Sequence, residues 1–136
     1  MLLGKCVFTQ KTNVKAMIIE RNKYLKELLD SRHNGLTKVI TGIRRSGKSF
    51  LLFNLLKTRL IDEGIDREHI IEMQFDDFAN KKYRNPAVFY DYVKSRISDG
   101  RMYYVLLDEV QLLTDFVDVL NGLMHIENVD LYVTGS

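Results

Sequence analysis

Apolar residues along this chain form short dense runs, separated by stretches in which they recur at helical spacing. The runs predict strands at residues 37–41, 70–75, 102–107 and 129–134. A run as continuously apolar as 102–107 is typical of a strand covered on both faces of a parallel sheet. The helical spacing predicts helices at residues 20–33, 48–62, 86–99 and 116–125. This alternation of helices and strands indicates an α/β fold with a parallel sheet.

Local signals mark several helix boundaries. Asn85 followed by Pro86 is typical of a helix start, because the Asn side chain caps free backbone N–H groups and proline has none to satisfy. Gly64 is expected to end the helix that begins near residue 48, and Thr114 or Asp115 is expected to cap the last one.

The first 16 residues show no helical period, so we expect a loosely ordered extension or a short strand there. Residues 17–136 form the predicted domain, and their number is sufficient for one hydrophobic core. The net charge of +2 is too small to indicate nucleic-acid binding by itself. One cysteine, Cys6, cannot form an internal disulfide, and no apolar run is long enough to span a membrane. These features predict a cytoplasmic protein.

Residues 42–49 carry the pattern Gly-x-x-x-x-Gly-Lys-Ser, which is typical of a phosphate-binding P-loop. The glycines permit backbone dihedrals that let successive N–H groups point inward at a phosphate. The positive end of the following helix adds to this attraction. Lys48 is expected to reach the β- and γ-phosphates of ATP, and the Ser49 hydroxyl to bind Mg²⁺. The predicted nucleotide-binding residues are Gly42, Ile43, Arg44, Arg45, Ser46, Gly47, Lys48, Ser49 and Phe50.

The context that a P-loop needs is also present, since a predicted strand precedes it and a predicted helix follows it. Two interpretations stay open for Arg44 and Arg45. Their side chains either contact phosphate or acidic neighbours, or they are solvated while the backbone N–H groups take part in the site.

A second motif, Asp108-Glu109, follows the apolar run 102–107. An apolar strand that ends in Asp is the Walker B pattern, whose carboxylate binds the Mg²⁺ of the nucleotide. The adjacent Glu can orient and deprotonate the water that attacks the γ-phosphate. We therefore predict Asp108 and Ser49 as metal ligands, and Glu109 and Lys48 as catalytic residues.

Two further polar segments are less specific. The pair Asp76-Asp77 lacks a third ligand, so it is better interpreted as a solvated strand end than as a metal site. The loop 78–85 interleaves basic and aromatic residues, which is compatible with nucleic-acid contact, but a solvated loop is the better interpretation.

Taken together, segments 42–49, 106–111 and 132–136 resemble the AAA-type ATPases common in archaea and bacteria. They are most similar to a branch with a Gly-x-Arg-Arg-x-Gly-Lys-Ser loop and a Thr-Gly-Ser strand end. The resemblance covers about residues 17–136.

The resemblance implies a three-layer α-β-α P-loop NTPase fold with a parallel sheet in the order 5-1-4-3-2. Strand 5, the helical lid and any arginine finger are missing from these residues, so the chain is expected to be a fragment of a longer ATPase and its strand 37–41 to lie at a sheet edge. Thr134 and Ser136 match the region of sensor 1. Self-association through the ATPase domain is also implied only by the resemblance.

The function predicted on these grounds is ATP binding and Mg²⁺-dependent ATP hydrolysis that couples the nucleotide state to a conformational change. Three alternatives stay open: a nucleotide-controlled switch or scaffold with little turnover, a motor stimulated by nucleic acid, and a small-molecule kinase. The Asp-Glu pair argues against the kinase.

Overall fold

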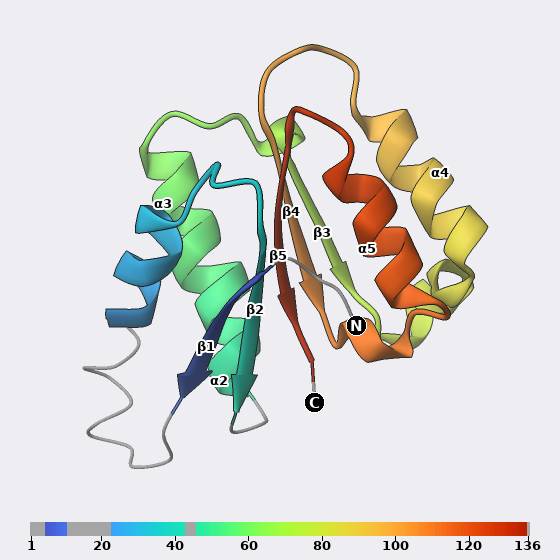
Figure 1. The fold of residues 1–136 in the computed structure, drawn as a ribbon, viewed down its shortest axis with the longest axis horizontal. Helices are drawn as coiled ribbons and strands as arrows, with labels where there is room; N and C mark the ends of the chain where they lie inside the picture. Colours follow the sequence, from blue (N-terminus) through green and yellow to red (C-terminus); the bar gives the residue numbers. More distant parts are fainter. Residues whose placement is uncertain (1–4, 11–22, 43–45, 136) are drawn as a thin grey trace.

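The structure, a computed structural model, describes residues 5–10, 23–42 and 46–135. These residues form three layers: a parallel sheet with helices packed on both of its faces (Figure 1). A helix at residues 23–30 and the run from α2 to α3 cover one face, and α4 and α5 cover the other. The predicted three-layer α/β fold is confirmed.

Within the described residues, the sheet has five strands in the order β1-β2-β5-β4-β3, and all four strand pairs are parallel. The strands are β1 (Lys5–Gln10), β2 (Thr37–Gly42), β3 (Ile70–Gln74), β4 (Tyr103–Asp108) and β5 (Val129–Thr134). The last four match the strands predicted from the apolar runs, and their order agrees with the 1-4-3-2 part of the expected topology.

The expectation that the strand at 37–41 lies at a sheet edge is wrong. β1 pairs with β2 along its whole length, from Lys5 opposite Thr37 to Gln10 opposite Gly42. An edge strand presents unpaired N–H and C=O groups, and the segment Val7-Phe8-Thr9 has the β-branched and aromatic residues that favour a strand. The sheet position expected to be empty is therefore filled by residues from the predicted N-terminal extension.

One long helical run follows the P-loop, as predicted for residues 48–62. It consists of α2 (Ser46–Phe50), the π-helical segment η1 (Leu51–Leu56) and α3 (Lys57–Asp62). Leu51, Leu52, Leu56 and Leu60 are fully buried on its sheet-facing side. Gly64, two residues beyond α3, has a φ of 97°, a backbone conformation that favours glycine and ends the run.

The other helices agree with the predicted spacing, with one correction at a cap. The side chain of Asn85 accepts hydrogen bonds from the N–H groups of Ala87 and Val88 and so caps α4 (Pro86–Arg96), as expected. Asp115 precedes α5 (Phe116–Met124), but it makes no side-chain capping bond, because its φ of 54° is left-handed instead of extended. Short 3-10 turns, η2 (Arg67–His69), η3 (Phe78–Arg84) and η4 (Val110–Leu112), connect the larger elements.

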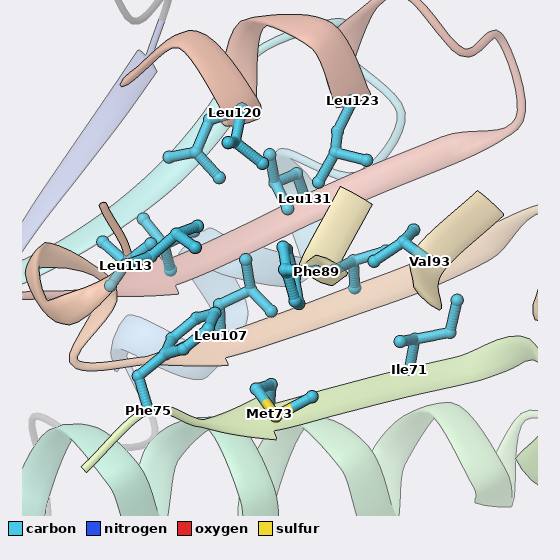
Figure 2. Packing of buried hydrophobic residues seen from close by; sticks show 14 of the residues in the cluster. Ile71, Met73, Phe75, Phe89, Val93, Leu107, Leu113, Leu120, Leu123 and Leu131 are labelled. Atoms are coloured by element: carbon cyan, nitrogen blue, oxygen red, sulfur yellow. The ribbon is translucent and has the colours of Figure 1, made fainter. Parts of the chain in front are cut away.

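Two hydrophobic clusters fill the spaces between the layers. The cluster under α4 and α5 joins Phe89, Val93, Leu120 and Leu123 of the helices to β3, β4 and β5 (Figure 2). The rings of Phe75 and Phe89 pack edge to face there, 5.1 Å apart. The cluster on the other face joins the residue 23–30 helix and the α2–α3 run to the same sheet.

A buried ionic cluster interrupts this apolar packing at the amino ends of the strands. Lys38 in β2 and Asp130 in β5 are 0% and 3% exposed, and the Nζ of Lys38 lies 2.6 Å from Oδ1 of Asp130. The hydroxyl of Tyr132 donates to Oδ2 of Asp130 at 2.6 Å, and Lys38 also donates to the carbonyl of Leu36 at 2.9 Å. Burial, with a further contribution from the Asp130 carboxylate, raises the pKa of Tyr132. The Asp130 carboxylate thus supplies the counter-charge for the buried ammonium of Lys38.

We expect Asp130→Asn to lower the free energy of unfolding by about 3–5 kcal/mol, because it leaves the Lys38 ammonium buried without its counter-charge. Urea denaturation of the parent and the variant measures this difference. The matched control is Asp66→Asn, which removes a pair to Arg101 whose side chains are 61% and 67% exposed. It should change the stability by at most about 1 kcal/mol. Equal effects of the two substitutions would contradict the role given to Asp130.

Candidate functional site

The carboxyl ends of the parallel strands meet at one edge of the sheet, and α2 begins at the same edge (Figure 1). In open α/β sheets, ligands bind outside this edge. Three segments distant in sequence converge there: the start of the α2 helical run, the end of β4 and the end of β5.

Asp108, the last residue of β4, is the central side chain of this edge. It is only 3% exposed. The Ser49 hydroxyl donates to its Oδ2 at 2.7 Å, and the Thr134 hydroxyl donates to its Oδ1. A buried carboxylate requires such donors. The bonds bring together the two predicted metal ligands, which lie 59 residues apart in the chain.

Lys48, the residue before Ser49, is also buried, with 1% exposure. Its Nζ donates to the backbone carbonyl of Gly135, just beyond β5, at 2.8 Å. The ammonium therefore links the P-loop helix to the end of β5. A buried cation bonded to a neutral carbonyl is well placed to bind an anion, since a charged acceptor gives a stronger hydrogen bond.

Glu109 leaves the strand in an unusual backbone conformation, with φ 55° and ψ 49°. The left-handed region costs a non-glycine residue about 1–2 kcal/mol, so surrounding contacts must hold it. The Glu109 N–H donates to Oγ1 of Thr134 at 3.0 Å, and its side-chain Oε1 accepts from Nε2 of Gln111 at 2.6 Å. Thr134 therefore contacts both residues of the Asp108-Glu109 motif.

The remaining predicted nucleotide-binding residues are distributed around the same edge. Gly42 ends β2, and Ser46 and Gly47 begin α2. Phe50, the last residue of α2, is 37% exposed. Ile43, Arg44 and Arg45 lie outside the described residues, as does Ser136.

The other polar segments singled out in the sequence lie on the turn after β3. Asp77 accepts a hydrogen bond from the Ala79 N–H at 3.0 Å and so caps η3. In η3, Lys81 lies 5.8 Å from the ring of Phe78, a side chain that is 82% exposed. Within the described ranges, no group of three or more His, Cys, Asp and Glu residues is arranged to bind a metal ion.

Sequence reasoning missed the contacts of Gln111 and of the Gly135 carbonyl. Both residues lie in segments on which the resemblance rests, 106–111 and 132–136, but neither received a role of its own. Gln111 can reach Glu109 because the chain turns through a left-handed residue, and the Gly135 carbonyl is a backbone group that every residue has. The signals available for Gln111 were its place in segment 106–111 and its position two residues after the predicted base.

Of the helices formed by residues 23–42 and 46–135, none combines the length and the apolar character that a membrane span needs.

Comparison with known proteins agrees with this geometry. A family model described as "AAA domain" matches residues 34–136. The chain is also 33% identical, over 123 residues, to an uncharacterized protein of Haemophilus influenzae. That similarity covers 90% of this chain but only 30% of the relative, so the chain spans less than a third of the relative's length. No solved structure matches the chain. Because the family match covers most of the residues, this chain belongs to the AAA domain family and contains a nucleotide-binding domain of the AAA type.

Proposed function

We propose that this domain binds ATP together with Mg²⁺ and hydrolyses ATP in the intact protein, and that the nucleotide state is coupled to a conformational change. The observation that carries the proposal is the 2.7 Å contact between the Ser49 hydroxyl and the buried Asp108 carboxylate. It brings the Ser49 hydroxyl and the Asp108 carboxylate together, and Lys48, the residue before Ser49 in the chain, is buried.

The residues at this point fit Mg²⁺ by their chemistry. Magnesium prefers oxygen ligands and is usually held by one or two protein groups together with phosphate oxygens and water. Ser49 and Asp108 would supply the protein oxygens. When bound, the ion would neutralise charge on the phosphates during the reaction.

Lys48 would bind the phosphates of the nucleotide. In the described structure its ammonium donates to the Gly135 carbonyl. A phosphate oxygen is the stronger acceptor because it is charged, so it would compete with this carbonyl for the ammonium.

Glu109 would act as the general base. Its carboxylate would orient a water and take one of the water's protons as the oxygen bonds to the γ-phosphorus. The bond between that phosphorus and the β–γ bridging oxygen breaks, and the products are ADP and phosphate. The bond from the Glu109 N–H to Thr134 fixes the backbone from which this side chain extends.

A second candidate function is a nucleotide-controlled switch with little turnover. The contact that favours it is the Lys48–Gly135 bond, which joins the P-loop helix to the end of β5. A nucleotide that draws Lys48 away from Gly135 would change a contact of β5 whether or not hydrolysis follows.

Lys48→Ala should weaken ATP binding severely. Truncating a buried charged partner costs about 2–5 kcal/mol, which corresponds to a Kd roughly 30- to 4000-fold weaker. Titration with a fluorescent ATP analogue measures the affinity. Lys94→Ala, an exposed lysine on α4, is the control and should bind as the parent does. Parental affinity in Lys48→Ala would exclude the site proposed here.

Glu109→Gln should bind ATP with parental affinity but hydrolyse it about 10²- to 10⁴-fold more slowly, because the amide cannot accept the proton of the attacking water. Phosphate release under saturating ATP and Mg²⁺ measures the rate. Glu127→Gln makes the same change at an exposed position beyond α5 and should keep the parental rate.

If Glu109→Gln hydrolyses ATP as fast as the parent, the role proposed for Glu109 is wrong. If the parent itself retains ATP tightly with negligible turnover, the switch is the better description of the domain.

A further inference from the structure

Gln111 is brought to Glu109 by the local turn of the chain. The left-handed Glu109 is followed at once by the 3-10 turn η4, in which the Leu112 N–H donates to the Glu109 carbonyl at 3.0 Å. Val110, which is buried, anchors the turn in the cluster under α5. The Gln111 side chain consequently points back along the chain, and its Nε2 lies 2.6 Å from Oε1 of Glu109.

The same amide also lies against the end of β5. A Cβ atom built on Gly135 would come within 3.3 Å of the Gln111 Oε1. The carbonyl of Gly135 in turn accepts the hydrogen bond from Lys48. The amide of Gln111 is thus placed between the proposed base and the residue that contacts the proposed phosphate-binding lysine, and glycine at position 135 leaves room for it.

We propose that Gln111 is a positioning residue, which holds the Glu109 carboxylate in the orientation needed to activate water. This inference rests on the proposed ATPase function. A Glu side chain has substantial rotamer freedom, and the N–H group of Gln111 restrains it through one oxygen. An ionised carboxylate has about four lone-pair sites, so this bond leaves it able to accept from a water.

The chemistry of the amide suits this role. A Gln side chain donates a hydrogen bond without carrying charge, so it orients the carboxylate without neutralising it as a lysine or arginine would. Since the donor contacts the proposed base, its loss should affect the rate of hydrolysis and leave nucleotide affinity unchanged.

Two variants of Gln111 in the intact protein test the proposal. Gln111→Leu removes the amide, and Gln111→Glu keeps nearly the same shape but replaces the donor with an acceptor. Each should lower kcat about 10- to 100-fold, the effect of losing one hydrogen bond to a charged group. The KM and the Kd for ATP should stay within about twofold of the parent. Asn121→Asp, which makes the same change from amide to acid on α5, should leave kcat, KM and the Kd for ATP unchanged.

A double-mutant cycle separates positioning from a merely structural effect. In a Glu109→Gln background, Gln111→Leu should have no further effect on the residual rate, since the base is already lost. The inference is overturned if either Gln111 variant retains the parental kcat, if kcat rises, or if Gln111→Leu lowers the rate equally in both backgrounds.

A readout independent of hydrolysis is the side-chain amide resonance of Gln111, identified by its absence from the NMR spectrum of Gln111→Leu. It should shift in Glu109→Ala and stay in place in Glu127→Ala; an unshifted resonance in Glu109→Ala would overturn the contact. Hydrolysis that needs Glu109 but not Gln111 would overturn this inference alone. Hydrolysis that does not need Glu109 would overturn the proposed function as well.

Discussion

The buried carboxylate of Asp108 is the constraint on which the site depends. A charged group with 3% exposure is stable only where donors surround it, and here the donors are the hydroxyls of Ser49 and Thr134. One hydroxyl comes from the P-loop helix and the other from β5. Because both donors must reach Asp108, the position of α2 is fixed relative to β4 and β5. The pairing of Ser49 with Asp108, on which the proposed Mg²⁺ site rests, follows from the same requirement.

At the opposite end of the sheet a second buried carboxylate is also paired, but there its main partner is a cation. There Asp130 of β5 compensates Lys38 of β2, and the Tyr132 hydroxyl supplies another donor to the carboxylate. A one-residue slip between these strands would direct Lys38 to the other face of the sheet, away from its counter-charge. Charged contacts thus tie β5 to its surroundings at both ends, while apolar packing fills the middle. This arrangement gives β5 a fixed register, which the site at its carboxyl end requires.

Much of this fold could be predicted from the sequence because its signals are local. The strands β3, β4 and β5 follow from short apolar runs, and the start of α4 follows from Asn85 and Pro86. The site motif was also readable, since Lys48, Ser49 and Asp108 occur in patterns whose spacing reflects their chemistry. The position of β1 was not predictable in this way, because its pairing with β2 is a contact between segments more than 25 residues apart. The same holds for Lys38, whose burial depends on a partner 92 residues later in the chain.

The contacts that sequence reasoning missed share a physical cause. In the described structure, the polar groups of the site bind one another: Lys48 donates to Gly135, Ser49 to Asp108 and Gln111 to Glu109. Buried polar groups must be paired whether or not a ligand is present, so a site built for a charged ligand needs internal partners of this kind. A ligand that takes Lys48 or Ser49 would have to replace these bonds, and each replacement changes a contact to β4 or β5. In the proposed function, nucleotide binding would therefore exchange one set of hydrogen bonds for another, and this exchange is the physical route by which occupancy of the site would reach the sheet.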